Sequence, residues 1–450
     1  MSVEADDKHY LWHPFTQQEI WEAEPQLVID RADGCYLFDS EGRRYLDGVS
    51  SLWVTAHGHR RAEINAAIID QLDRVAHTTF LGLTHEPATK LARRLVELAP
   101  GHLRRVFYSD TGAAAVEIAL KMAFQYWQQT DPPRPSKTRF FSLNNDYHGD
   151  TVGAMSVGGV DLYHALYKPL LFPIYQEPGA YCYRCHLRKS YPSCGIACLD
   201  QVKRTIAAHA DELAAVVMEP MIQAAAGMIA FPPGYTRAIR ETAREHDVLF
   251  IVDEVATGFG RTGTMFACEQ EGIEPDLMAI GKGLSGGYLP LAATLATEEI
   301  YRAFLGPIDS GRTFYHGHTY TGNPVACAAA LASLDLFETE RTLDKLQPRI
   351  SQLTEGLRRL ETLRHVGNVR QRGFMAGVEL VRDVDSRQPF PAVERVGHRV
   401  CNEARARGLI LRPLGNVIAV MPPLVISEAE LSFLLDVVEE SVRAVTESPE

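Results

Sequence analysis

The sequence predicts an α/β protein in which a large, helix-covered parallel β-sheet is joined by a smaller α+β domain built from both chain ends. The first observation is size: 450 residues, 46% of them hydrophobic, are enough for two or three domains with large cores. The second is an alternation of short apolar runs with helical patterns. The third is that these runs are apolar throughout, as in strands covered on both faces.

Four strand candidates in the middle of the chain each end in a polar or glycine-rich stretch. They cover residues 106–108, 215–218, 248–252 and 277–280, with helical patterns such as 113–127 and 233–246 between them. The residues that follow these strands include Asp110, Glu219, Asp253 and Lys282. In open α/β sheets the ligand binds beyond the carboxyl ends of the strands, so we expect these four side chains at one edge of the sheet.

The two ends of the chain differ from the middle and are expected to form the smaller domain. Turns at Gly34 and Gly42 predict a hairpin within residues 27–46. The C-terminal part predicts an amphipathic helix at 343–363, strands at 369–380 interrupted at Gly373 and Gly377, a hairpin at 409–421 around Gly415, and a helix at 428–445. We expect the chain to divide into an N-terminal segment 1–65 that is part of the small domain, a large domain 66–330, and a C-terminal small domain 331–450.

The charge balance and the apolar runs disfavour several classes of function. The 45 Lys and Arg residues against 57 Asp and Glu give a net charge of −12, which disfavours binding to nucleic acid. No apolar run approaches the roughly 18 residues of a membrane span. The first ten residues are polar and do not resemble a signal peptide. We therefore expect a cytoplasmic enzyme without nucleic-acid or membrane partners, with its 8 cysteines mostly reduced.

Lys282 and Asp253 are the first candidates for chemistry, because each directly follows a strongly apolar strand. A lysine between two glycines can form a Schiff base when desolvation tunes its amine, although a solvated loop lysine is the alternative. The Asp253 carboxylate needs a cationic partner such as a pyridinium nitrogen, or else it caps the following helix. A lysine Schiff base with an aspartate on the ring nitrogen is how proteins bind pyridoxal phosphate.

Gly112 and Tyr147 add two further features of a cofactor site. Gly112 lies between a strand and a helix, where backbone N–H groups can bind a phosphate; an ordinary helix cap is the alternative. Neither a GxGxxG here nor a Walker motif is present, which disfavours dinucleotides and nucleoside triphosphates. Tyr147 follows the strand candidate 139–143 and can stack on a planar cofactor, or it simply packs.

The cysteines divide into four scattered residues and one cluster. Cys182-x-x-Cys185 and Cys194-x-x-x-Cys198 lie in the segment 177–199. Cysteine pairs at short spacing can hold a structural zinc ion, but the gap between these pairs is shorter than in the usual zinc patterns. A reduced, packed loop is the alternative, and we assign the cluster no catalytic role.

A long motif, DEVATGFGRTG, runs from Asp253 to Gly263, and the step Gly281-Lys282-Gly283 follows the next strand. Together they resemble the class III aminotransferases, which are pyridoxal-phosphate enzymes of fold type I, and the resemblance covers nearly the whole chain. Within this class the chain is most similar to the diaminopelargonate-forming branch of biotin biosynthesis. The matching segments are 12–16, 47–53, 121–127, 147–151, 317–319, 322–324, 411–413 and 421–423.

The resemblance implies a role for each matching residue. Lys282 would bind the cofactor covalently and move protons, Asp253 would hold the pyridine nitrogen, and Tyr147 would stack on the ring. The phosphate would be bound by Gly112 and Ala113, and by Thr319 from across the interface of a homodimer with shared sites. Glu219 completes the expected cofactor-binding set. The expected substrate-binding set is Trp53, Phe15, Gly317 and Arg412, with the Arg412 fork on a carboxylate.

The reaction implied by the resemblance is a two-stage transamination of small-molecule substrates. A donor amine gives its amino group to the cofactor, and 8-amino-7-oxononanoate then takes it to become 7,8-diaminononanoate. Family members that use S-adenosylmethionine typically have Tyr where this chain has Phe15, and a branch with Phe there uses lysine, so both donors stay open. The alternative is an ω-amino acid or polyamine:pyruvate aminotransferase of the same class.

Overall fold

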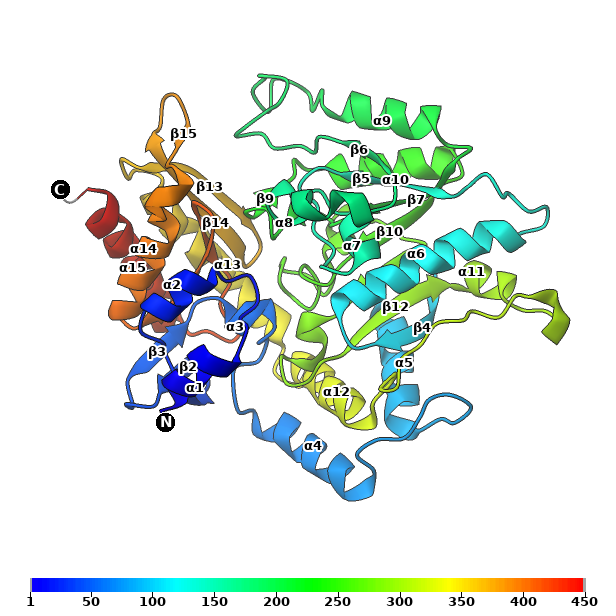
Figure 1. The fold of residues 1–450 in the computed structure, drawn as a ribbon, viewed down its shortest axis with the longest axis horizontal. Helices are drawn as coiled ribbons and strands as arrows, with labels where there is room; N and C mark the ends of the chain where they lie inside the picture. Colours follow the sequence, from blue (N-terminus) through cyan, green and yellow to red (C-terminus); the bar gives the residue numbers. More distant parts are fainter. Residues whose placement is uncertain (1, 448–450) are drawn as a thin grey trace.

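The computed structural model describes residues 2–447, and a seven-stranded sheet forms the centre of its larger part (Figure 1). The strand order is β4-β12-β11-β10-β7-β5-β6. In chain order the strands are β4 (Leu103–Ser109), β5 (Arg139–Leu143), β6 (Tyr175–Glu177), β7 (Leu213–Met218), β10 (Leu249–Asp253), β11 (Leu277–Ile280) and β12 (Ala292–Thr297). The four predicted strands are all present, and they lie in one sheet.

One strand departs from the predicted parallel arrangement. β5, β6, β7, β10 and β11 pair in parallel, but β12 runs antiparallel to both of its neighbours, β11 and β4. The sequence analysis missed β12, because Ala292 and Ala293 at its start are small and its run resembles a buried helix as much as a strand. The sheet is therefore mixed, with a single antiparallel strand among parallel ones.

The alternation of side chains along each strand explains why helices cover both faces of the sheet. In β10, Leu249 and Ile251 belong to one buried cluster, while Phe250 and Val252 belong to the other. One face is covered by α6 (Gly112–Gln129) and α11 (Glu298–Ala303). The opposite face is covered by α5 (Glu86–Leu98), α9 (Leu199–Ala208), α10 (Tyr235–Glu245) and α12 (Pro324–Thr339).

Both chain ends contribute to the smaller part, as expected from the sequence. The predicted N-terminal hairpin is formed by β1 (Ile29–Asp33), β2 (Tyr36–Asp39) and β3 (Arg44–Asp47), and β3 pairs in parallel with β16 (Leu409–Ile410). A second sheet contains β13 (Val366–Arg372), β14 (Met375–Asp383), β15 (Gln388–Pro389), β17 (Arg412–Leu414) and β18 (Val417–Val420). Its helices are α13 (Thr342–Leu360), α14 (Val396–Ala406) and α15 (Glu428–Thr446). The exact domain boundaries stay a prediction.

Gly377 does not interrupt a strand, which corrects the prediction for residues 369–380. The break between β13 and β14 lies at Gly373, whereas β14 continues through Gly377 and pairs there with Arg370 and Ala419. A Cβ at Gly377 would lie 2.9 Å from the Met228 Cβ and 3.1 Å from the Gly227 carbonyl oxygen. The glycine therefore serves the close approach of a loop from the larger part.

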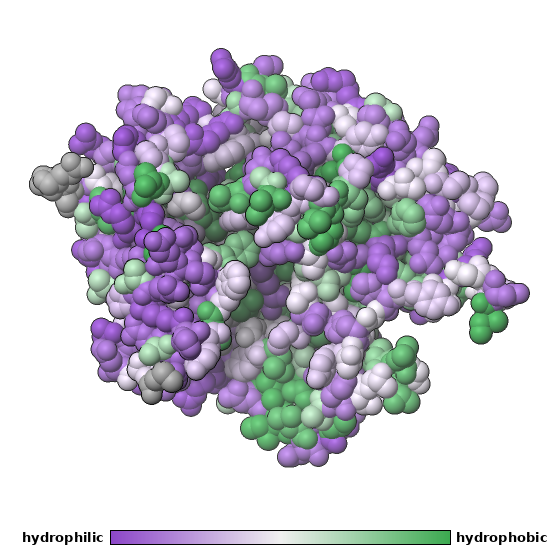
Figure 2. Space-filling model, viewed as in Figure 1, coloured by the Kyte–Doolittle hydropathy of each residue, from purple (hydrophilic) through white to green (hydrophobic). Residues whose placement is uncertain are grey.

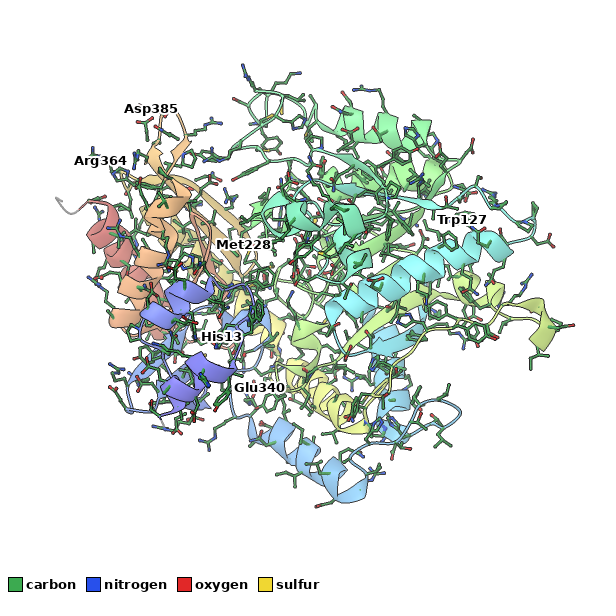
Figure 3. All side chains as sticks on the ribbon, in the orientation of Figure 1. His13, Trp127, Met228, Glu340, Arg364 and Asp385 are labelled. Carbon is green, nitrogen blue, oxygen red and sulfur yellow. The ribbon has the colours of Figure 1, made fainter. Side chains whose placement is uncertain are left out.

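The remaining α-helices and the small two-stranded sheet lie outside these sheets. They are α1 (Val3–Tyr10), α2 (Gln18–Ala23), α3 (Ser50–Trp53), α4 (Ala62–Arg74), α7 (Val152–Ser156), α8 (Asp161–His164), β8 (Ile222–Gln223) and β9 (Ile229–Ala230). Met228, between β8 and β9, lies at the junction of the two parts (Figure 3) and packs in a buried cluster with Trp53, Ala256 and Met375. No helix within residues 2–447 has the length and apolar character needed to cross a bilayer.

Candidate active site

A pocket of about 470 Å³ opens beyond the carboxyl ends of β5, β7, β10 and β11. It is lined by Trp53, Thr111, Gly112, Ala113, Tyr147, His148, Gly149, Asp150, Thr151, Glu219, Ala225, Asp253, Val255, Ala256 and Lys282. Seven of the residues expected from the sequence therefore meet in one place, although they come from distant points of the chain. Asp110, which follows β4, is exposed instead and lies 3.8 Å from the His318 Nε2 atom.

Lys282 is held in an unusual backbone conformation at the base of the pocket. Its φ is +45°, in the left-handed region that costs energy for a residue with a Cβ. The next residue, Gly283, allows a close approach to Phe259, because a Cβ there would lie 3.0 Å from the Phe259 Cβ. Burial lowers the pKa of the Lys282 ammonium, against the opposing charges of Asp253 and Glu219. Its Nζ lies 5.3 Å from the centre of the Trp53 ring. The chain thus fixes a lysine whose ammonium loses its proton more readily than that of an exposed lysine.

Asp253 is a buried carboxylate whose two oxygens are both bonded. The Val255 N–H donates to Oδ1 at 2.9 Å, and the His148 Nδ1 lies 2.8 Å from Oδ2. These bonds hold the carboxylate at the end of β10, where it lines the pocket. A group with this geometry can accept a further hydrogen bond from a protonated ring nitrogen.

His148 was missed by the sequence analysis, although the adjacent Tyr147 was not. Its imidazole is completely enclosed, and its Nε2 has no hydrogen-bond partner and lies 4.0 Å from the Asp146 carboxylate. Burial alone would lower the pKa of His148, but the hydrogen bond to Asp253 and the charges of both aspartates raise it. The imidazole therefore lies between two buried carboxylates that favour its protonated form. The only signal in the sequence was its position beside Tyr147.

Glu219 is fixed by backbone groups at the end of β7. Its carboxyl oxygens accept hydrogen bonds from the Tyr147 N–H at 3.1 Å and the Ala224 N–H at 3.0 Å. Burial and the nearby charge of Asp146 raise the pKa of this carboxyl. Glu219 is thus a carboxyl with a raised pKa in the pocket wall, held by backbone N–H donors.

The N-terminus of α6 forms a cradle at one end of the pocket that is suited to an anion. Thr111 caps this helix by accepting a hydrogen bond from the Ala114 N–H at 3.2 Å, which leaves the N–H groups of Gly112 and Ala113 for a ligand. A Cβ on Gly112 would lie 2.6 Å from a methyl carbon of Val255, so no larger residue fits there. Gly149, at φ +118°, passes equally close to Ala113.

Aromatic side chains line the route from the pocket toward the small domain. The Tyr147 hydroxyl donates to Asp150 at 2.7 Å, and its ring lies edge-on to Tyr163 with the centroids 6.0 Å apart. Tyr163 in turn meets Phe15 edge-on at 5.2 Å. Phe15 is therefore at the outer end of this row and does not line the pocket itself. Tyr163 was not predicted as a site residue.

Arg412 lies close to Tyr163 at the start of β17. Burial raises the pKa of the Tyr163 hydroxyl, and the positive charge of Arg412 partly opposes this, which places the two groups near each other. Among the hydrogen bonds and ion pairs of residues 2–447, none uses the half-buried guanidinium of Arg412. A charge held near an aromatic row without a protein partner is free to bind an anionic ligand.

Gly317 and Thr319 lie outside the pocket formed by this chain. Both are exposed in the segment between α11 and α12, where Thr321 bonds the backbone of His318. The structure therefore does not bring these two residues to Lys282 within one chain. Their role across a dimer interface stays a prediction.

The zinc hypothesis for the cysteine cluster is not supported by the structure. Within residues 2–447, no group of three or more His, Cys, Asp or Glu side chains is arranged so that it could hold a metal ion. A tetrahedral zinc ion requires its sulfur ligands at about 2.3 Å from one point. Cys182, Cys185, Cys194 and Cys198 are free thiols that line a common small cavity instead.

The pocket has a suitable protein group for each of three parts of pyridoxal phosphate. The cradle at Gly112 suits the phosphate, Asp253 suits the ring nitrogen, and Lys282 suits the aldehyde carbon. The buried Trp53 Nε1 has no hydrogen-bond partner within the described residues and offers a further donor at this site. The residues present therefore fit this cofactor.

Comparison with known proteins gives one consistent result. The model of the family "Aminotransferase class-III" matches residues 18–442. The chain is 54% identical, over 98% of its length and 97% of the relative, to an adenosylmethionine-8-amino-7-oxononanoate aminotransferase of Geobacter sulfurreducens. It is 51% identical, over 98% and 97%, to the protein of the same name from Aquifex aeolicus.

Solved structures similar to this chain are aminotransferases as well. The adenosylmethionine-8-amino-7-oxononanoate aminotransferase of Methanocaldococcus jannaschii superposes with a TM-score of 0.94 at 46% identity, covering 98% of this chain and 99% of that one. An amine transaminase from an uncultivated Pseudomonas species in a PLP-bound form has a TM-score of 0.92 at 38% identity, covering 97% and 99%.

Proposed function

We propose, from the premise that this chain belongs to the class III aminotransferase family, that it transfers an amino group to 8-amino-7-oxononanoate in biotin biosynthesis. Membership makes it a transaminase that depends on pyridoxal phosphate. The observation that carries the choice of substrate is the unpaired Arg412 near Tyr163, whose ring packs against Phe15, because an aliphatic acid needs both a carboxylate partner and an apolar path. Relatives at 46–54% identity with this activity in their names support it.

Each polar group of the pocket has its own role in the proposed reaction. Bound pyridoxal phosphate supplies a ring that withdraws electrons from the carbon bearing the amino group. The N–H groups of Gly112 and Ala113 bind its phosphate, and Asp253 keeps the ring nitrogen protonated. Lys282 is the covalent attachment point, and its Nζ takes a proton from one carbon and returns it to another when released. Burial lowers the pKa of the Lys282 ammonium, which makes its free amine easier to form.

Arg412 and the aromatic row would orient the acceptor. The Arg412 guanidinium binds the carboxylate at one end, and Phe15, Tyr163 and Trp53 exclude water from the aliphatic chain between that end and Lys282. An ω-amino acid or polyamine:pyruvate aminotransferase is the second candidate. It is favoured by the likeness to an (S)-enantioselective ω-transaminase of Thermomicrobium roseum, at 36% identity and a TM-score of 0.93 over 98% of both chains.

The amino donor that we propose is S-adenosylmethionine. The names of the relatives from Geobacter sulfurreducens and Aquifex aeolicus both contain it. Phe15 lies more than half exposed at the outer end of the aromatic row. Its ring has no hydroxyl that could hydrogen-bond to a polar donor passing there. Lysine is therefore the second donor to be tested.

A homodimer with shared sites is the assembly that we propose. Figure 2 shows apolar side chains gathered over α4 and the loop that follows it, where Ile69, Leu72, Leu81 and Leu83 are exposed. A second copy of the chain would bury this surface. It would also bring Gly317 and Thr319 to the pocket of the other subunit. We propose a cytoplasmic location, in keeping with the free thiols of all eight cysteines.

A half-reaction experiment tests the proposed function. The enzyme is converted to its amino-loaded form with S-adenosylmethionine or with lysine, and 8-amino-7-oxononanoate is then added while the cofactor spectrum is followed. We expect S-adenosylmethionine to load the enzyme and 8-amino-7-oxononanoate to unload it. Unloading by pyruvate but not by 8-amino-7-oxononanoate would support the ω-transaminase instead, and loading by lysine alone would replace the proposed donor.

Arg412→Gln is expected to raise the KM for 8-amino-7-oxononanoate by roughly 10- to 100-fold, because one charged hydrogen-bond pair contributes about 1.5–3 kcal/mol. The value of kcat should change much less. Steady-state kinetics measure both, with the methyl ester of the substrate as a control whose KM should not respond. Arg364→Gln, at an exposed arginine on the far side of the small domain (Figure 3), is the matched variant. An unchanged KM in Arg412→Gln would exclude Arg412 as the carboxylate partner.

A further inference from the structure

One wall of the active-site pocket is the loop 224–228, which joins β8 to β9 and is called the pocket-wall loop below. Ala225 in this loop lines the pocket directly. The Ala224 N–H donates a hydrogen bond to the carboxyl group of Glu219, a second lining residue, at 3.0 Å. The position of the pocket-wall loop therefore sets the shape of the pocket on this side.

The pocket-wall loop lies between the pocket and the small domain. Gly227 has a φ of +113° and Met228 a φ of +57°, so the backbone takes up positive φ values at two successive residues. Met228 packs in the same buried cluster as Trp53, which lines the pocket. A Cβ on Gly377 of β14 would lie 2.9 Å from the Met228 Cβ. A loop in such a conformation needs contacts from its surroundings to hold it.

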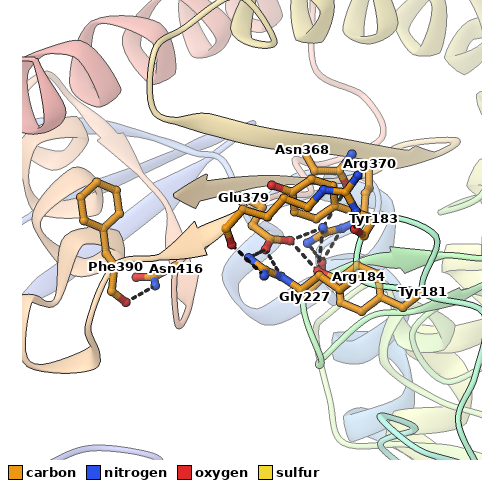
Figure 4. Close-up of polar contacts among 10 residues, drawn as sticks. Tyr181, Tyr183, Arg184, Gly227, Asn368, Arg370, Glu379, Phe390 and Asn416 are labelled. Carbon is orange, nitrogen blue, oxygen red and sulfur yellow. Dashed lines mark hydrogen bonds and ion pairs between the residues drawn. The ribbon is translucent and has the colours of Figure 1, made fainter. Parts of the chain in front are cut away.

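Arg370, a buried residue of β13, supplies such a contact from the small domain. Its Nε and Nη2 atoms both donate to the Gly227 carbonyl, at 3.1 and 2.7 Å. Its Nη1 donates to the Asn368 side-chain oxygen and the Tyr181 hydroxyl, both at 3.0 Å, and forms an ion pair with Glu379 (Figure 4). A planar guanidinium can make these bonds at once, whereas a lysine ammonium is a single point charge.

Glu379, the ion-pair partner of Arg370, is itself held by the segment 178–198. The Tyr181 hydroxyl donates to the Glu379 Oε2 at 2.5 Å, and the Arg184 Nε donates to its Oε1 at 2.7 Å (Figure 4). Although burial alone would raise the pKa of Glu379, the charge of Arg370 and these hydrogen bonds lower it. The guanidinium of Arg370 is therefore oriented by groups from two separate parts of the chain.

The buried ion pair of Arg370 and Glu379 is a poor source of stability by itself. Removing two charges from water costs free energy, and apolar residues of similar volume often stabilise a fold equally well. The pair can, however, aim a guanidinium, which apolar packing cannot do. It aims this one at the carbonyl of Gly227, which lies 143 positions away in the sequence. The geometry thus indicates a role in orientation.

We propose that Arg370 is a positioning residue of the active site. Its guanidinium fixes the pocket-wall loop through the Gly227 carbonyl, and Glu379, Tyr181 and Arg184 hold the guanidinium in the orientation that this contact requires. Arg370 does not line the pocket, so it acts only through the loop. The inference rests on the proposed function for the identity of the acceptor.

The proposed role separates substrate binding from the chemical step. Lys282 and Asp253 follow β11 and β10, and neither is a hydrogen-bond partner of Arg370 within residues 2–447. A loosened pocket-wall loop should therefore weaken acceptor binding and leave proton transfer nearly unchanged. We expect the KM for 8-amino-7-oxononanoate to rise by roughly 10-fold and kcat to stay within about threefold.

Two arginine-to-lysine variants on the same strand test this role. Arg370→Lys keeps the positive charge beside Glu379 but loses the double hydrogen bond to the Gly227 carbonyl. Arg372→Lys is the matched control, because Arg372 donates one hydrogen bond, at 2.8 Å, to the Phe231 carbonyl beyond the far end of β9. Arg370→Lys should show the rise in KM, and Arg372→Lys should have the KM of the wild type.

Hydrogen–deuterium exchange of the holoenzyme without substrate gives a second measurement that does not depend on activity. The amides of Gly227 and Met228 are bonded to the Ala224 carbonyl in the wild type, at 3.2 and 3.0 Å. In Arg370→Lys we expect the amides of the pocket-wall loop to exchange roughly 10-fold faster or more, while those of β10 exchange at the wild-type rate. If Arg370→Lys does not fold, Tyr181→Phe, which removes only a hydroxyl, should give the same two changes at smaller size.

Three results would overturn the proposal. A wild-type KM and wild-type loop exchange in Arg370→Lys would mean that the charge alone is sufficient. Faster exchange of β10 as well as the loop would make Arg370 a general determinant of stability. Equal effects in Arg372→Lys would mean that the contact with Gly227 has no special role. Because exchange is measured without substrate, a failure of the proposed acceptor would affect the KM values and leave the exchange results unchanged.

Discussion

Replacing Lys282 by alanine is expected to lower kcat by roughly 10⁴-fold or more, because in the proposed mechanism the change removes both the covalent attachment point and the group that moves the proton. The structure places its Nζ in the pocket beside Asp253 and Glu219, whose charges partly oppose the effect of burial on its pKa. The left-handed φ of +45° at Lys282 indicates that the chain accepts strain to hold this side chain in position. Alanine should fold there, because it is smaller and equally tolerant of the turn.

Two measurements separate this role from a structural one. Mass spectrometry after borohydride reduction should locate the cofactor on Lys282 in the wild type and find no cofactor bound to the Lys282→Ala chain. Added primary amines should restore part of the proton transfer. Lys345→Ala, at an exposed lysine of α13, is the control and should retain full activity. Covalent cofactor in Lys282→Ala, or undiminished kcat, would refute the assignment.

Replacing Asp253 by asparagine is expected to lower kcat by roughly 10²- to 10⁴-fold with little change in shape. Asparagine can keep the hydrogen bond from the Val255 N–H but carries no charge to hold a protonated ring nitrogen. It also removes one of the carboxylates that raise the pKa of the buried His148. Cofactor affinity, measured by titration of the apoenzyme, should fall together with kcat.

His148→Asn is the informative companion variant. Its amide can still donate to Asp253 but cannot carry a charge, so the effect should be smaller than that of Asp253→Asn and should appear mainly in the pH profile. His148→Leu removes the hydrogen-bond donor as well, so its kcat should be lower than that of His148→Asn. Equal activity of Asp253→Asn and wild type would mean that the charge of Asp253 is not needed, and the proposed mechanism would fail.

The local sequence was enough to identify the elements that carry the site. Fully apolar strands, helical patterns between them and polar residues at the strand ends placed Glu219, Asp253 and Lys282 at one edge before any contact was known. These features could be predicted because they depend on the hydrophobic pattern within one segment and on a general property of α/β sheets. The motif from Asp253 to Gly263 then indicated the class III aminotransferases, and with them a reaction that depends on pyridoxal phosphate.

Other features depend on contacts between distant segments and emerged only from the folded chain. The antiparallel direction of β12 is decided by its neighbours β11 and β4, and the glycine at 377 exists because the loop at Gly227 passes over it. The bond between His148 and Asp253 joins residues 105 positions apart. The enclosure of Cys182 and Cys198 around one cavity depends equally on how their segment folds back. A residue's type and its neighbours along the chain indicate what it can do, whereas its electrostatic partners, and hence its protonation, are set by which distant groups the packing of the core brings within a few ångströms.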